Sequence, residues 1–308
     1  MINDFSSLSF SISTSNLSYK LLTSYLPNSY VSSTDISWLR GLTNLKVLNL
    51  TGVDLSAASS VHITNWAEPL SVLANLRELS LSDCSIAGPF PLHEFYNLSL
   101  LSVFRMDSNP LSSPIPLRMA NLTSLSVLDL NNCQLHGSMP YLPQLQYLDV
   151  SGNQDLMVDL IHMFDHSWPK LQLLSITLTN VVGPIPSSVS NASSLVSLLA
   201  ARCSIRVSLP HSLSNLSHLQ YLDLSFNSLN GSIPYAISNL RNLQALNLNH
   251  NSLHGPFPTS ICEVSSLATL LVIGNNLNGS VPSCIFKLRK LQVFDVTGNN
   301  LNGTISFN

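Results

Sequence analysis

The sequence predicts an α/β repeat solenoid, a superhelix of short turns with a parallel β-sheet on its concave face and short 3-10 or α-helical segments on its convex face. Three features point to it. Leucines recur every 24 residues at Leu219, Leu243, Leu267 and Leu291. An apolar residue follows each of them three positions later, and a Gly-x-apolar-Pro segment closes most units. A repeat of this length is one small unit that buries its apolar side chains only against its neighbours.

The composition argues against a nucleic-acid partner, a membrane-spanning helix and a signal peptide in this chain. Charged residues make up 9% of the 308 residues and the net charge is -3, so no cationic surface is available for a phosphate backbone, and we expect no nucleic-acid partner. No apolar run reaches the 18 or more residues typical of a membrane-spanning helix. The first residues are rich in serine and lack the basic start and apolar middle of a signal peptide.

A solenoid grows by addition, so the chain is interpreted as one array. Residues 1–37 are the least regular part and are interpreted as one or more degenerate repeats. Residues 38–308 carry about eleven turns, which open at Leu45, Leu76, Leu101, Leu125, Leu145, Leu171, Leu195, Leu219, Leu243, Leu267 and Leu291. The early spacing is irregular, with 31 residues from Leu45 to Leu76 and 20 from Leu125 to Leu145. Insertions in such arrays map to loops.

Each position of a turn has a physical task. In Leu222-Asp223-Leu224 the alternation directs the leucines inward and the aspartate outward, as a strand requires. The asparagine that follows turns inward, where its amide bonds backbone groups of the bend and of the neighbouring turn. We predict a structural column of such residues, in which the cysteines are buried thiols: Cys84, Asn109, Cys133, Asn153, Cys203, Asn227, Asn251, Asn275 and Asn299.

The closing segments identify the type of repeat. They are Gly88-x-Phe90-Pro91, Gly137-x-Met139-Pro140, Gly183-x-Ile185-Pro186, Gly231-x-Ile233-Pro234, Gly255-x-Phe257-Pro258 and Gly279-x-Val281-Pro282. From roughly Trp38 to Ser306 the chain resembles the plant-specific leucine-rich repeat, whose mark is L-x-G-x-I-P. The stretch ISWLRGLTNLKVLNLTGVDLS, a spacer and LRELSLSDCSIAGPFP are similar to the N-terminal half of plant disease-resistance receptor-like proteins, as are the SIC and PSC segments that contain Cys262 and Cys284.

This resemblance implies the ectodomain of a receptor-like protein or receptor kinase, glycosylated and outside the plasma membrane. Such an ectodomain binds a peptide or a microbial or host protein, and signals through a co-receptor kinase in defence or development. The signal peptide, Cys-containing cap, transmembrane helix and kinase of these families are not found in the printed residues. We therefore expect a fragment, with membrane anchorage only through segments outside this chain.

The candidate ligand-binding residues are taken as outward positions on the concave strands. They are Gln172, Leu178, Leu199, Arg202, Gln220, Tyr221, Phe226 and His250. Apolar residues on an otherwise polar sheet suggest a contact surface, although scattered apolar residues are also normal on soluble proteins. The aspartates Asp129, Asp149, Asp223 and Asp295 are interpreted as a solvated strand position.

Two kinds of covalent modification are candidates. N-glycosylation sequons occur at Asn16, Asn49, Asn97, Asn121, Asn191, Asn215, Asn230, Asn278 and Asn302, and Asn49 is expected to point into the concave face. Cys262 and Cys284 lie after the proline in successive turns. They form either a disulfide or two free thiols.

No motif predicts catalysis, so we expect no enzyme, no cofactor and no metal. His162 and His166 with Asp159 and Asp165 resemble a metal cluster in spacing, but the apolar residues between them indicate a short amphipathic helix on the convex side. Two alternatives to the receptor stay open. One is a secreted inhibitor of microbial wall-degrading enzymes, similar to the polygalacturonase-inhibiting proteins, and the other is an interaction scaffold without a ligand of its own.

Overall fold

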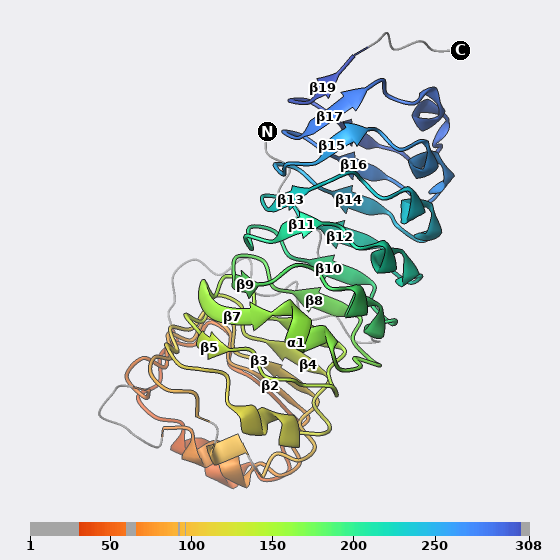
Figure 1. The fold of residues 1–308 in the computed structure, drawn as a ribbon. Helices are drawn as coiled ribbons and strands as arrows, with labels where there is room; N and C mark the ends of the chain where they lie inside the picture. Colours follow the sequence, from red (N-terminus) through yellow and green to blue (C-terminus); the bar gives the residue numbers. More distant parts are fainter. Residues whose placement is uncertain (1–30, 60–65, 92, 96, 303–308) are drawn as a thin grey trace. The chain divides into compact units, whose positions relative to one another are not determined.

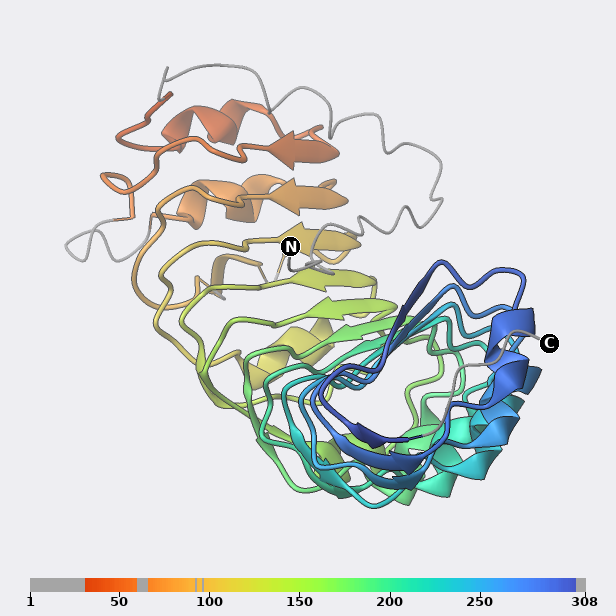
Figure 2. The same ribbon diagram turned by 90° about the horizontal axis from the view of Figure 1, so that it is seen from above.

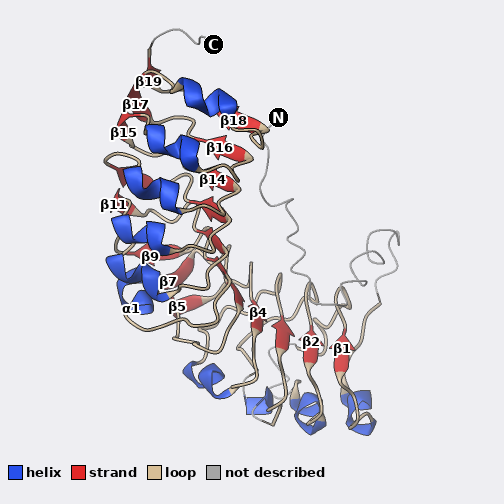
Figure 3. Ribbon diagram, turned by 90° about the vertical axis from the view of Figure 1, so that its right-hand side faces the viewer, coloured by secondary structure: helices blue, strands red, loops and turns tan. Residues whose placement is uncertain are grey.

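A computed structural model describes residues 31–59, 66–91, 93–95 and 97–302. From Ser32 onward these residues form one coil of repeated turns (Figure 1). Strands lie along one side of the coil and short helices along the other (Figure 3). The predicted solenoid is confirmed, whereas the prediction for residues 1–37 lies mostly outside the described residues and stays a prediction.

Within the described residues the main sheet contains eleven parallel strands, stacked in chain order along the coil (Figure 2). They are β1 Val47–Asn49, β2 Glu78–Ser80, β3 Val103–Arg105, β4 Val127–Asp129, β6 Tyr147–Asp149, β8 Leu173–Ser175, β10 Ser197–Leu199, β12 Tyr221–Asp223, β14 Ala245–Asn247, β16 Thr269–Leu271 and β18 Val293–Asp295. Each begins two residues after the leucine that opens a predicted turn. Equivalent residues pair across the sheet, as Leu198 does with Leu222 and Leu222 with Leu246.

The alternation in each turn explains the strands. Leu222 and Leu224 are buried, and Asp223 between them is half-buried on the concave side. The inward leucines of all turns belong to one continuous apolar core. Because a single turn buries these side chains only against its neighbours, the stacking itself stabilises every strand.

Short helices form the convex side. They are η2 Ser37–Gly41, η3 Glu68–Val72, η4 His93–Phe95, η5 Leu117–Asn121, α1 Leu160–Phe164, η6 Ser187–Asn191, η7 His211–Asn215, η8 Tyr235–Asn239, η9 Thr259–Glu263 and η10 Ser283–Lys287, where η denotes a 3-10 helix. From η5 onward each 3-10 helix follows a proline in the extended conformation, such as Pro210 before η7. Its central residue is buried, as Leu213 is in η7. No helix in the described residues has the length and apolar character needed to cross a bilayer.

One described turn carries no helix. Between Pro140 and Leu145 the chain has the four residues 141–144, where the turn from Pro210 to Leu219 has the eight residues 211–218 that include η7. The row of helices is therefore interrupted between η5 and α1 (Figure 3). The short spacing from Leu125 to Leu145 is the sequence signal of this loss.

Three small parallel sheets lie after the main strands and were not predicted. They consist of β5 His136–Ser138, β7 Asp155–Asp159 and β9 Asn180–Val182; β11 Arg206–Ser208 and β13 Ser228–Asn230; and β15 His254–Pro256, β17 Asn276–Gly279 and β19 Asn300–Leu301. The glycine of the closing segment follows or lies within these strands. Gly231 has φ +75°, and a Cβ atom there would lie 3.0 Å from the Cβ of Ser208, so glycine permits the close approach of two turns.

Candidate ligand-recognition surface

The last residues of the main strands form one continuous row on the concave face, because neighbouring strands pair in register. The row reads Arg105, Asp129, Asp149, Ser175, Leu199, Asp223, Asn247, Leu271 and Asp295. Its chemistry changes along the coil. Carboxylates follow one another on β4 and β6, and from β8 onward Leu199 and Leu271 are interspersed among polar residues.

The carboxylates on β4 and β6 are not fully solvated, which corrects the prediction for that position. Burial raises the pKa of Asp129 to about 7, and the neighbouring Asp149 and Asp107 contribute to the rise. Burial also raises the pKa of Asp149, while its hydrogen bonds from Ser151 oppose the change. Burial raises the pKa of Asp223 in the same way. Asp129 is therefore partly protonated near neutral pH, and the protonated forms of Asp149 and Asp223 are favoured relative to a solvated carboxyl group.

Four of the predicted binding residues form a stack at the edge of this sheet. Leu178, Arg202, Phe226 and His250 occupy the same position in four consecutive turns, and we call them the edge ladder. The guanidinium carbon of Arg202 lies 3.9 Å from the centre of the Phe226 ring. The rings of Phe226 and His250 are stacked with their centres 4.5 Å apart. This geometry is that of a cation–π contact continued by an aromatic pair.

The prediction that these four are strand residues is wrong. They lie in the turn three residues after their strands, and each has a left-handed φ, between 51° for His250 and 57° for Leu178. Each backbone N–H donates to a carbonyl of the next turn, for example Phe226 to Asn249 at 2.8 Å. Because the same backbone hydrogen bond forms at all four residues, their side chains stack at the distance between successive turns.

The ladder ends on a glycine. A Cβ atom at Gly274 would lie 2.7 Å from Nδ1 of His250, so the imidazole lies over the backbone of the next turn. At the opposite end, Leu178 and Arg202 line a small cavity of about 280 Å³ together with Gln154, Thr179, Asn180 and Ser204. Leu178 is 38% exposed and Phe226 42% exposed. The ladder is thus an open ridge with a hollow at one end.

The other predicted binding residues lie on the concave sheet rather than on the ladder. Gln172 and Leu199 are half-buried. The Tyr221 hydroxyl donates to Oε1 of Gln244 at 3.0 Å, and Nε2 of Gln244 donates to Oε1 of Gln220 at 3.0 Å. Gln244 was missed by the sequence reasoning, although it occupies the same repeat position as Gln220. The structure brings these three into one network at the start of β12 and β14, at the other end of these strands from the ladder.

The asparagine column bridges successive turns. Oδ1 of Asn153 accepts from the backbone N–H of Cys133 and of Leu135, both at 2.9 Å. Its Nδ2 donates to the carbonyls of Leu130 and Val150. Bonds of the same kind are made by Asn109, Asn227, Asn251, Asn275 and Asn299. Each amide satisfies backbone groups that would otherwise lack partners inside the coil.

Cysteines in this column make only some of the hydrogen bonds that an asparagine amide makes there. The thiols of Cys84, Cys133 and Cys203 are buried, and the Cys84 thiol donates to the Leu50 carbonyl at 3.0 Å. Burial raises the pKa of Cys84 to about 11 and that of Cys133 to about 12, which disfavours the reactive thiolate form of both. Cys262 and Cys284 are joined in a disulfide between successive turns.

The sequons fall on three parts of the surface. Asn121, Asn191 and Asn215 end η5, η6 and η7, and Asn97 follows η4 closely. Three others lie at the small sheets, namely Asn230, Asn278 and Asn302. All of these are exposed, and Asn49, which ends β1, is the described sequon that faces the concave side. Asn16 lies outside the described residues.

The histidine and aspartate segment forms α1 and the end of β7. Oδ1 of Asp159 accepts from the backbone N–H of Ile161 and of His162, which caps the helix. His162 and His166 lie with ring centres 5.8 Å apart. Within the described part of the chain, no three His, Cys, Asp or Glu side chains are arranged to hold a metal ion.

Comparison with known proteins agrees with this geometry. Models of the leucine rich repeat match residues 193–253 and 75–98. The LRR ectodomain of the Arabidopsis thaliana receptor kinase GASSHO1/SCHENGEN3, solved in complex with CASPARIAN STRIP INTEGRITY FACTOR 2, is 30% identical with a TM-score of 0.77, over 90% of this chain and 35% of that chain. The structure of a TDR receptor gives the same TM-score at 27% identity, over 90% of this chain and 47% of that one.

The coil, its column of asparagines and these matches define a plant-type leucine-rich repeat solenoid. More narrowly, the chain is similar to plant receptor-like proteins. Receptor-like protein 6 of Arabidopsis thaliana is 31% identical over 163 residues, which cover 50% of this chain and 16% of that protein. The chain thus spans about one sixth of the length of that relative.

Proposed function

We propose that this chain is part of the ligand-recognition surface of a plant cell-surface receptor. It binds a peptide or protein on the extracellular side of the plasma membrane, and signalling passes to a partner kinase in defence or development. Its similarity to receptor-like proteins and to a receptor ectodomain solved with a bound partner supports this proposal.

The edge ladder is the observation that carries the proposal. Left-handed φ suits glycine, asparagine and aspartate, and the equivalent position is Gly52, Gly152, Gly274 or Gly298 in other turns. Four consecutive turns instead hold large side chains there, at a cost in backbone strain that the fold does not require. Strained residues with large exposed side chains are typical of binding sites.

The chemistry of the ladder suits a protein ligand. Arg202 forms no ion pair within the described part of the chain, and its stacking on Phe226 holds the guanidinium in one plane. Arginine and aromatic residues dominate the binding energy of protein interfaces, and rigid side chains lose less entropy on binding. No sequon asparagine in the described residues is a member of the ladder, and Asn230, four residues after Phe226, lies near it along the chain.

Peptide display tests the proposal. The full chain is immobilised and selected against a random peptide library, and the binding of enriched peptides is measured by surface plasmon resonance. We expect Phe226→Ala and Arg202→Ala to weaken binding by about 10- to 100-fold, the usual range of hot-spot residues. Val47→Ala is the matched control, because Val47 is 53% exposed on the same sheet at β1.

The outcome separates the proposal from its alternatives. Binders that are insensitive to both ladder variants would place the recognition surface elsewhere. Failure to enrich any saturable binder would favour a scaffold without its own ligand. A chain that instead binds and inhibits a microbial polygalacturonase would be a secreted inhibitor.

A further inference from the structure

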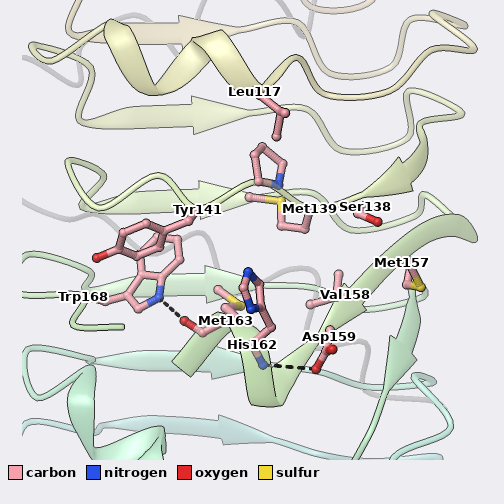
Figure 4. A pocket seen from close by; sticks show the side chains of 11 residues that line it. Leu117, Ser138, Met139, Tyr141, Met157, Val158, Asp159, His162, Met163 and Trp168 are labelled. Atoms are coloured by element: carbon pink, nitrogen blue, oxygen red, sulfur yellow. Dashed lines mark hydrogen bonds between the residues drawn. The ribbon is translucent and has the colours of Figure 1, made fainter. Parts of the chain in front are cut away.

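The interruption in the row of convex helices leaves a cavity. It has a volume of about 520 Å³ and lies between Leu117 at the start of η5 and His162 and Met163 of α1 (Figure 4). Its lining includes Pro140 and Tyr141 of the turn from Leu125 to Leu145, which carries no helix. A volume of this size accommodates several side chains of a binding partner.

The walls of the cavity are mostly apolar. Trp168 and Met163 are buried, and the indole N–H donates to the Met163 carbonyl at 2.8 Å, so the polar atom of the ring is already satisfied. Leu117 is 77% exposed and Met157 is 39% exposed at the rim. Methionine side chains adapt to differently shaped ligands, which suits a surface built to receive another side chain.

The repeat itself indicates what fits this place. In complete turns the space holds a five-residue helix whose central residue is buried, such as Val189 in η6 at 0% exposed and Leu213 in η7 at 3%. The walls on both sides belong to the two turns that flank this place, and both flanking turns carry a helix, η5 in one and α1 in the other. The complementary occupant is therefore one short helical turn with a single central apolar side chain.

We propose that this cavity is a docking site for a short helical segment of a partner protein, which supplies the missing helix. Among the described residues that line it, Asp159 is a carboxylate and none is lysine or arginine. Helical segments with neutral or basic residues beside the central apolar one are thus favoured. The cavity shares no lining residue with the hollow at the end of the edge ladder, so the two sites can be altered separately.

Methionine-methyl NMR tests the proposal directly. The chain has six methionines, and Met139, Met157 and Met163 line the cavity. The probe is a capped synthetic peptide of residues 209–219, which contains η7. We expect saturable shifts of these three methyl signals with a dissociation constant on the order of 1 mM. The signal of Met106, which is buried in the core, should not move.

Matched variants decide the outcome. A peptide with Leu213→Ser, and the protein with Leu117→Lys, should each bind at least about fivefold more weakly. Tyr235→Lys should bind normally, because Tyr235 is the equivalent residue of η8, is 64% exposed and has helices on both sides. Replacement of residues 141–144 by the sequence of residues 211–218 should close the site.

Three results would overturn the proposal. The first is the absence of saturable shifts, and the second is equal binding of the serine peptide. The third is a shift of the same signals with protein concentration alone, which would assign the cavity to a second copy of this chain. If the chimera does not fold, the two lysine variants still decide, since both replaced side chains are exposed.

Discussion

Asn153→Leu isolates the contribution of the asparagine column to stability. Leucine has nearly the same shape as asparagine but neither donates nor accepts a hydrogen bond. Asn153 is fully buried, and its Oδ1 is the acceptor that the described residues provide for the N–H groups of Cys133 and Leu135. The substitution therefore leaves two buried donors without a partner.

The expected loss follows from these bonds. Each orphaned buried donor costs about 1–3 kcal/mol, so two cost roughly 2–6 kcal/mol. Burial of the leucine side chain offsets about 2 kcal/mol of this. The free energy of unfolding should fall by about 0–4 kcal/mol, with about 2 kcal/mol at the centre of the range.

Urea unfolding followed by circular dichroism measures this change, with amide hydrogen exchange as a local readout. Exchange should accelerate at Cys133 and Leu135 first. Asn239→Leu is the control, since Asn239 is exposed at the end of η8. Equal urea midpoints and unchanged exchange at the two amides would refute the view that the column satisfies buried backbone groups.

Three further predictions concern other parts of the array. Because burial and the neighbouring carboxylates raise the pKa of Asp129 to about 7, the folded state binds more protons than the unfolded state between pH 4 and 7. Stability should therefore fall by about 1–3 kcal/mol as the pH rises through this window, and Asp129→Asn should flatten the pH profile of the melting temperature. Replacing Cys262 and Cys284 by serine removes a disulfide between residues 22 positions apart, so the unfolded chain gains conformational entropy. The free energy of unfolding measured by urea titration should fall by about 3 kcal/mol. Leu222→Ala should cost about 2–5 kcal/mol and Phe226→Ala less than about 1 kcal/mol by the same titration, because the leucine is core and the phenylalanine is an exposed ladder residue; equal losses would contradict this assignment.

The regular parts of the fold could be read from the sequence because one physical requirement repeats. The leucine spacing located all eleven main strands, since each turn must direct its leucines into the same core. The asparagine column also follows from spacing. Its partners do not, because the N–H groups that Asn153 accepts belong to a turn about twenty residues away.

The edge ladder shows where pattern reasoning stops. Alternation in Leu222-Asp223-Leu224 was extended to Phe226, but the strand ends at Asp223 and the backbone at Phe226 is left-handed. Alternation carries no signal of that change. Leu178, Arg202, Phe226 and His250 are each 24 residues apart. A comparison of equivalent positions in successive turns therefore predicts the stack, whereas alternation along one turn does not.

The turn without a helix also bears on how the array unfolds. In a stack of repeats each repeat is stabilised only by contacts with its neighbours, so the weakest interface between two adjacent repeats limits the cooperativity of unfolding. Between Leu125 and Leu145 the coupling comes from the sheets, without the helix contacts that most other turns add. We expect a molecule pulled from its ends to yield there first, so that two blocks separate in successive steps rather than in one event.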